Sequence, residues 1–263
     1  MHACLATACE QAQCDPNSVQ FAAVCFGFSG GPQDKNAYSR ELVRSARYKI
    51  THDAEIALAG ATAGEPGIIV IGGTGSMAFG RNARGQTARA GGWGYVFGDE
   101  GGGFDLTRRA LRAALRAEEG WGPATALRQL LLEASGAADA NDLLHRFYVD
   151  FDRVSIAGMA KLVTQAAEQG DDVAQNILRD AAGELAILVE GIYRNLFREP
   201  VPVATIGGVF RSLRLRNEFA ERVRESIGCR VTPPRYGPAA GALLEALRLD
   251  GNWSELKDVP EEK

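Results

Sequence analysis

A glycine-rich turn in this chain consists of residue types that bind phosphate groups. The turn GGTGS, residues 72–76, follows the apolar run GIIVIGG and precedes a second strand-like run. Glycines in such a turn let backbone N–H groups approach an anion closely, and those of Thr74, Gly75 and Ser76 are the candidates. An ordinary hairpin turn is the alternative. The turn does not open a helix and no GK[ST] follows it, so it is neither a dinucleotide fingerprint nor a Walker loop.

Carboxylates and a tryptophan flank this turn in the sequence. Asp53 stands at the predicted start of a helix that leads into the strand before the turn, and capping that helix is its simplest role. Asp99 and Glu100, in GDEGGG, could bind sugar hydroxyls or the waters of a metal ion, or form a solvated acidic loop. Trp93, in GGWG, either packs in the core or offers an apolar platform to a sugar ring.

A second glycine pair lies far along the chain, at Gly207 and Gly208 in the segment IGGVFRS. It follows a buried strand and opens onto a helix. Backbone without side chains could pack there against a flat heterocycle, and a plain strand-to-helix turn is the alternative.

These motifs lie in an alternation of strands and helices, which is typical of α/β architecture. The spacing of apolar residues predicts strands over residues 20–28, 67–73, 77–80, 86–90, 201–208 and 229–233. It predicts a helix that ends near Gln13 and further helices over 36–48, 53–63, 104–119, 125–135, 141–149, 154–169, 171–197, 213–227 and 239–249. The middle of the chain is therefore expected to be helical.

Composition excludes several classes of protein. The 263 residues suffice for one large domain or two lobes, and 33 acidic against 29 basic residues give a net charge of −4, so we expect no nucleic-acid partner. No apolar run approaches the ~20 residues of a membrane span, so we expect no membrane contact and a cytoplasmic location. The five cysteines are odd in number and scattered, and the three histidines form no metal pair, which favours reduced thiols and no zinc site.

The ordered blocks together resemble a known family. Asp53 with its helix is followed by IIVIGGTGS, GGWGYVFGDEGGG, IGGVF and GPAAGALLEAL. This order is similar to that of the actin-like superfamily, and more narrowly to the N-acetylglucosamine kinase branch of the BadF/BadG/BcrA/BcrD ATPase family. The resemblance extends from about residue 21 to residue 249. It implies an α/β, two-lobed actin-like ATPase (ribonuclease H-like) fold that binds ATP, Mg²⁺ and an amino sugar, with a homodimer as an open possibility.

The resemblance also implies roles for individual residues. Asp53 would be the general base that takes the proton from the sugar hydroxyl. The sugar-side loop would contain Trp93, Asp99 and Glu100. ATP would be bound by the second phosphate loop, the adenosine motif and a glycine of the connecting helix: Gly73, Thr74, Gly75, Ser76, Gly207, Gly208 and Gly241. No residue is identified as a metal ligand.

One departure from the family pattern concerns the N-terminal lobe. Family members begin with a hairpin that carries a first phosphate motif of the DGGGTKT type, and no counterpart precedes Cys4. We therefore expect residues 1–65 to be an incomplete N-terminal lobe, residues 66–249 a helix-rich C-terminal lobe, and residues 250–263 a polar tail. Only residues 21–28 form a clear strand before residue 60. Because the first phosphate motif has no counterpart, we expect the chain to be a weak or an inactive kinase.

Three alternatives to a sugar kinase follow from the sequence. The motif Gly27-Phe28-Ser29-Gly30-Gly31 matches the nucleophile elbow of α/β-hydrolases, but no histidine after His145 could complete a triad with Ser29. A BadF-type activating ATPase would need cysteines near the phosphate loop, and none lies between Cys25 and Cys229. A sugar-binding protein without turnover is the third alternative.

Overall fold

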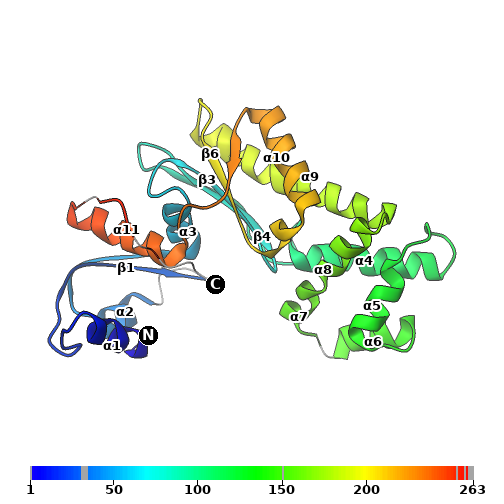
Figure 1. The fold of residues 1–263 in the computed structure, drawn as a ribbon, viewed down its shortest axis with the longest axis horizontal. Coiled ribbons are helices and arrows are strands. Elements are labelled where there is room, and N and C mark those ends of the chain that lie inside the picture. The colour runs from blue at the N-terminus through cyan, green and yellow to red at the C-terminus, as the bar shows by residue number, and fades with distance from the viewer. Residues whose placement is uncertain (1, 31–34, 150, 253, 258, 260–263) are drawn as a thin grey trace. The chain divides into compact units, whose positions relative to one another are not determined.

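The computed structural model describes residues 2–30, 35–149, 151–252, 254–257 and 259 (Figure 1). The chain forms two compact units. Unit 1 consists of Met1–Glu65 and Pro234–Lys263, and unit 2 consists of Pro66–Pro233. No helix among the described residues combines the length and the apolar character that crossing a bilayer requires.

Unit 1 is built on two parallel strands, which pair from Phe21 opposite Ser45 to Phe28 opposite His52. The second strand ends immediately before the helix that begins at Asp53. The C-terminal helix packs on this helix and on the first strand. The elements of unit 1 are α1 (His2–Gln11), β1 (Phe21–Phe28), α2 (Asn36–Leu42), β2 (Ser45–His52), α3 (Asp53–Ala61) and α11 (Pro238–Asp250).

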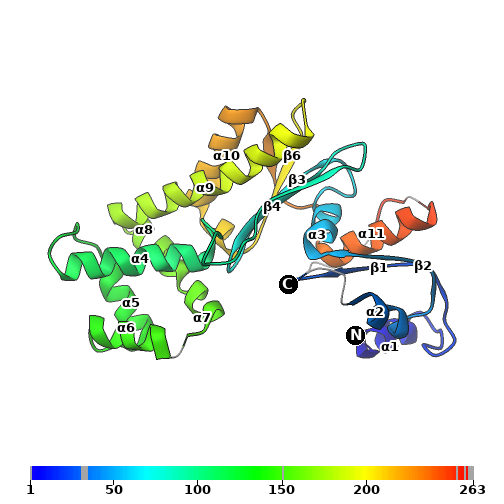
Figure 2. The same ribbon diagram turned by 180° about the vertical axis from the view of Figure 1, so that it is seen from behind.

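Helices α3 and α11 approach each other through glycines, and both ribbon views show the two helices side by side (Figures 1 and 2). A Cβ atom on Gly241 would overlap the carbonyl oxygen of Ile56, and one on Gly60 would lie 2.9 Å from the carbonyl carbon of Gly237. Glycine at these positions therefore allows a backbone-to-backbone contact that no other residue permits.

Unit 2 contains a five-stranded mixed sheet in the order β5-β4-β3-β6-β7. Its central strand, GIIVIG, is almost entirely buried, as expected for an apolar run covered on both faces. The strand β3 pairs antiparallel with β4 and parallel with β6. The strands are β3 (Gly67–Gly72), β4 (Ser76–Arg81), β5 (Thr87–Gly91), β6 (Pro202–Ile206) and β7 (Arg230–Thr232).

The long helix α9 covers one face of this sheet and packs against β3, β4 and β5 (Figure 2). Asp171 caps its start by accepting the amide of Ala174 at 2.8 Å. Helix α10 packs against α9 and ends at Gly228, whose φ of 69° suits a left-handed cap. The helices of unit 2 are α4 (Gly103–Glu118), α5 (Leu127–Ser135), α6 (Ala140–Val149), α7 (Arg153–Gly158), α8 (Ala160–Glu168), α9 (Asp172–Leu196), the 3-10 helix η2 (Gly208–Arg211) and α10 (Leu213–Ile227).

Three sequence predictions differ from the structure. The helix predicted over 36–48 ends at Leu42, and β2 follows it, so β1 has a parallel partner instead of standing alone. The helix predicted over 154–169 is divided at Met159 into α7 and α8. The lobe predicted over 66–249 ends at Pro233, because α11 packs on α3 in unit 1 through the glycine contact.

Candidate active site

The glycine-rich turn is a three-residue loop between β3 and β4, closed by the pairing of Gly72 with Ser76. The amide of Gly73 donates to the carbonyl oxygen of Gly75 at 3.0 Å. The amides of Thr74 and Gly75 have no acceptor in the part of the chain that the structure describes. Two of the three predicted backbone donors, those of Thr74 and Gly75, are therefore available to an anion, whereas Ser76 belongs to the β3–β4 pairing; binding of phosphate there stays a prediction.

The start of α4 forms hydrogen bonds to the backbone of this loop. The amides of Gly103 and Phe104 donate to the carbonyl oxygens of Gly73 at 2.8 Å and Thr74 at 3.0 Å. A Cβ atom on Gly102 would lie 2.6 Å from the carbonyl carbon of Gly75. The run of glycines in GDEGGG thus brings the helix N-terminus into backbone contact with the loop, and the helix uses its first free amides there.

The two acidic residues of GDEGGG contact the phosphate loop in different ways. Asp99 is 7% exposed, has a φ of 63°, and its carboxylate lies where a Cβ atom on Gly75 would be. Glu100 contributes its carbonyl oxygen, which accepts the Ser76 hydroxyl at 2.6 Å. Both residues contact the loop, and a side chain at position 75 would displace the Asp99 carboxylate.

Asp105 anchors this assembly to α4, and sequence reasoning missed it. It is 2% exposed, and its carboxylate accepts Arg108 at 2.7 Å, Arg109 at 2.8 Å and the amide of Gly101 at 3.1 Å. One buried carboxylate therefore ties the GDEGGG loop to two arginines of the helix.

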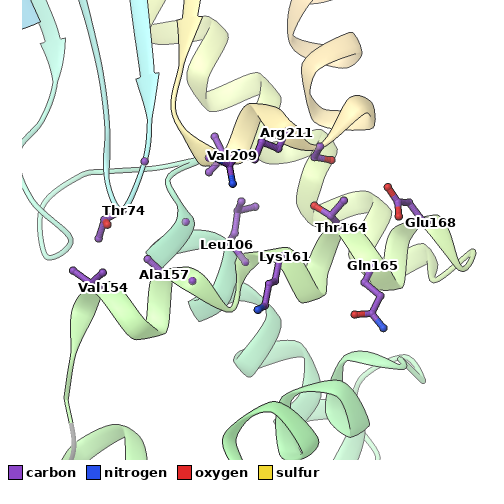
Figure 3. Close-up of a pocket in the computed structure, with 16 residues that line it drawn as sticks. Thr74, Leu106, Val154, Ala157, Lys161, Thr164, Gln165, Glu168, Val209 and Arg211 are labelled. Carbon is purple, nitrogen blue, oxygen red and sulfur yellow. The ribbon is translucent and has the colours of Figure 1, made fainter. Parts of the chain in front are cut away.

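A pocket of about 540 Å³ opens beside the phosphate loop within unit 2. Figure 3 shows Thr74 at one end, α7 and α8 along one wall, and Val209 and Arg211 of η2 on the opposite wall. Lys161 and Arg211 supply positive charge, and Glu168 lies toward the far end from Thr74. The pocket is lined by Gly73, Thr74, Gly103, Leu106, Val154, Ala157, Gly158, Ala160, Lys161, Thr164, Gln165, Glu168, Gly208, Val209, Arg211 and Ser212.

Two glycines leave open space in this pocket, whereas their neighbours serve the packing of the chain itself. A Cβ atom on Gly73 or on Gly208 would meet nothing within 4 Å. Gly207 has a φ of 108°, and a Cβ atom there would overlap the carbonyl oxygen of Gly72. The two motifs predicted from glycines therefore meet at one pocket, with bare backbone exposed on both sides.

Residues 2–246 of the chain match the BadF/BadG/BcrA/BcrD ATPase family. The chain belongs to this family. The recognition from sequence blocks is thereby confirmed.

Relatives of this ATPase family member carry the names of amino-sugar kinases. An N-acetylmuramic acid/N-acetylglucosamine kinase of Clostridium acetobutylicum is 35% identical over 207 residues, which cover 75% of this chain and 68% of that protein. An N-acetyl-D-glucosamine kinase of Dictyostelium discoideum is 31% identical over 247 residues, covering 89% of this chain and 77% of that protein.

A solved structure confirms the fold of this ATPase family member. A proposed N-acetylglucosamine kinase from Chromobacterium violaceum superimposes with a TM-score of 0.72 at 30% identity, covering 91% of this chain and 81% of that one. The mixed α/β, actin-like class predicted from the sequence is therefore correct.

Three further predicted site residues, Asp53, Trp93 and Gly241, lie outside the pocket lining. Asp53 is exposed in unit 1, and one of its carboxylate oxygens accepts the amide of Ala54 at 2.8 Å. Trp93 is 67% exposed, and the guanidinium of Arg89 lies 4.8 Å from its ring centre, so it is not a core residue. Gly241 lies in the α3–α11 contact of unit 1 and does not line the pocket of unit 2. Its part in nucleotide binding stays a prediction.

The hydrolase alternative does not agree with this family and fold. Ser29 directly follows β1, and the last residue of its motif, Gly31, lies outside the described residues.

Sequence reasoning found the pocket's glycines but missed the wall formed by α8. Lys161, Thr164, Gln165 and Glu168 recur at helical spacing, and the opposite face of the same helix, which includes Leu162 and Val163, is buried. This polar stripe beside an apolar stripe is the signal that could have found them.

Proposed function

We propose that this chain is an ATP-dependent kinase of N-acetylglucosamine or a closely related amino sugar. The observation that carries the proposal is 35% identity over 207 residues to an N-acetylmuramic acid/N-acetylglucosamine kinase. Family membership and the pocket beside an anion-binding loop support it.

The pocket of unit 2 fits a nucleotide. The free amides of Thr74 and Gly75 would hold phosphate oxygens, since backbone donors in a tight turn bind anions. The bare backbone at Gly208 would lie against the adenosine, because no side chain occupies that space. Bound MgATP would supply the γ-phosphoryl group. The described residues contain no group of three or more acidic, histidine or cysteine side chains that could hold a metal, so no residue is assigned to Mg²⁺.

Asp53 would act as the general base of the transfer. A sugar hydroxyl oxygen forms a bond to the γ-phosphorus, the bond from that phosphorus to the bridging oxygen of ADP breaks, and the hydroxyl proton passes to Asp53. One oxygen of the exposed Asp53 carboxylate accepts the Ala54 amide, and this hydrogen bond would orient the group. Such a reaction depends on positioning and charge stabilisation more than on covalent chemistry.

The test is ADP release with ATP, Mg²⁺ and a panel of amino sugars, comparing the chain with Asp53→Asn. We expect release that depends on the sugar and falls by about 10²- to 10⁴-fold in the variant, the usual contribution of a general base. Asp15→Asn is a matched control, since Asp15 is an exposed carboxylate of the same unit that holds only its own turn.

Each alternative predicts a different result in the same assay. Sugar binding without ADP release would indicate a sugar-binding protein without turnover. ADP release that is independent of every sugar would favour an activating ATPase of the same family. Undiminished sugar-dependent release from Asp53→Asn would reject Asp53 as the base.

A further inference from the structure

A network of charged groups surrounds the point where β2 passes into α3. The ammonium of Lys49, on β2, donates to Oε1 of Glu55 on α3 at 2.6 Å and to Oε2 of Glu245 on α11 at 2.6 Å. The hydroxyl of Thr51 donates to the second carboxylate oxygen of Glu55. One lysine therefore joins β2 and the adjacent helix α3 to α11, whose Glu245 is 196 residues away in the sequence.

Two members of this network, Thr51 and Glu55, flank Asp53 in the sequence. Thr51 lies two residues before Asp53, and Glu55 lies two residues after it. The Glu55 carboxylate in the first turn of α3 thus binds Lys49 and Thr51 at the end of β2, and Asp53 lies between Thr51 and Glu55 in the chain. Asp53 itself is exposed, whereas Thr51 and Ala54 on either side of it are buried.

The network is partly buried. The Glu245 side chain is 2% exposed, the Glu55 side chain 18% and the Lys49 side chain 28%. The guanidinium of Arg248, a side chain 44% exposed, lies 3.6 Å from Glu245 and donates to the carbonyl oxygen of Gly64 at 2.6 Å. Lys49 therefore bridges two carboxylates, and the bond to Glu245 lies at an almost fully buried side chain, where charge-assisted hydrogen bonds are strong.

The protonation state of Lys49 is held by the same contacts. Burial lowers its pKa, but the hydrogen bonds to Glu245 and Glu55 outweigh burial and leave the pKa above its ordinary value. The ammonium therefore stays charged through the neutral range and keeps both carboxylates.

We propose that Glu55, held by Lys49 and Thr51, is a positioning residue that orients Asp53 for proton transfer. This inference rests on the proposed function, since it assigns a role relative to the base of that reaction. Glu55 does not touch the reacting atoms in this proposal. It acts by fixing the first turn of α3, and a displacement of about 1 Å at a catalytic group can cost about 10²-fold in rate.

The experiment measures kcat, the KM for ATP and the thermal midpoint of Glu55→Ala in the full chain. We expect kcat to fall about 10- to 100-fold, with the KM for ATP unchanged because the pocket lies in the other unit. Glu55→Gln keeps an acceptor for Thr51 and should recover most of the lost rate. Glu41→Gln is the matched control, since Glu41 is an exposed glutamate of the same unit, outside this network.

A double-mutant cycle separates positioning from a purely structural role. If Glu55 acts through Asp53, then Glu55→Ala causes no further loss in the Asp53→Asn background, where the residual rate is followed in long incubations. Equal losses in both backgrounds, or a wild-type kcat in Glu55→Ala, would overturn the inference. Should Glu55→Ala not fold, Thr51→Val removes one hydrogen bond at nearly constant volume, and a kcat equal to the parent's would count equally against it.

The outcomes for the two proposals are distinguishable. Absence of sugar-dependent ADP release from the parent chain rejects the proposed function. Asp53→Asn with full activity rejects Asp53 as the base, and the positioning role of Glu55 with it. Asp53→Asn without activity but Glu55→Ala with full activity rejects only the positioning role.

Discussion

Alanine should destabilise the folded chain at Gly207 and stabilise it at the adjacent Gly208. Gly207 has a φ of 108°, and its new Cβ atom would overlap the carbonyl oxygen of Gly72. Backbone strain and overlap together should cost about 2–4 kcal/mol. For a unit of this size, each kcal/mol lowers the thermal midpoint by roughly 2–4 °C, so Gly207→Ala should melt roughly 4–16 °C lower. Gly208→Ala meets no atom within 4 Å and should gain about 0.4–1 kcal/mol from a less flexible unfolded chain.

The affinity for ATP should rank the two variants in the opposite order: Gly208→Ala, the more stable variant, should lose more affinity than Gly207→Ala. The methyl group of Gly208→Ala would enter the pocket, where a steric conflict of about 1–3 kcal/mol weakens binding about 5- to 150-fold. Differential scanning fluorimetry gives the midpoints, and isothermal titration with ATP at a temperature below both gives the affinities. A similar drop in midpoint for the two variants would refute the packing argument. Unchanged ATP affinity in Gly208→Ala would refute the assignment of this pocket to the nucleotide.

Two further results follow from buried groups. Asp105→Ala removes the acceptor shared by two arginines and the amide of Gly101. The free energy of unfolding, measured in urea, should therefore fall by about 3 kcal/mol. A fall of less than about 1 kcal/mol would show that solvent screens these contacts. Burial raises the pKa of Cys25 from 9.0 to about 12. At pH 8 a thiol reagent should therefore label the exposed Cys4 and Cys14 first and the half-buried Cys25 far more slowly, and equal rates would contradict this. Because the folded pKa is the higher one, this thiol stabilises the fold below pH 9, and the effect is lost as the pH rises toward 12.

Local chemistry in the sequence was sufficient to predict the strand and turn of the phosphate loop. The run GIIVIGG can only be a buried element, and the following GTGS allows only a tight turn, so β3, the loop and β4 follow from residues close in sequence. The same holds for α9, whose apolar stripe and Asp171 cap are contained within one segment. These features depend on propensity and periodicity, which act over a few residues.

The strand β2 shows where such reasoning fails. The segment SARYKITH carries Arg47 and Lys49 and reads as the continuation of a helix. Lys49 can occupy a largely buried strand position because Glu55 and Glu245 neutralise it, and Glu245 is 196 residues away in the sequence. Long-range pairing of charges overrides local propensity here, and no window of sequence contains both partners.

The sequence by itself determined the family, the order of the motifs and the residue types that could do the chemistry. Only the tertiary structure decided that the glycines at 73 and 208 face one open pocket, that Asp99 is buried against Gly75, and that α11 returns to α3. The physical reason is that glycine looks the same in sequence whether it makes room for a ligand, for a carboxylate or for another helix. The difference lies in what surrounds the missing side chain, and that is set by contacts between segments far apart in the chain.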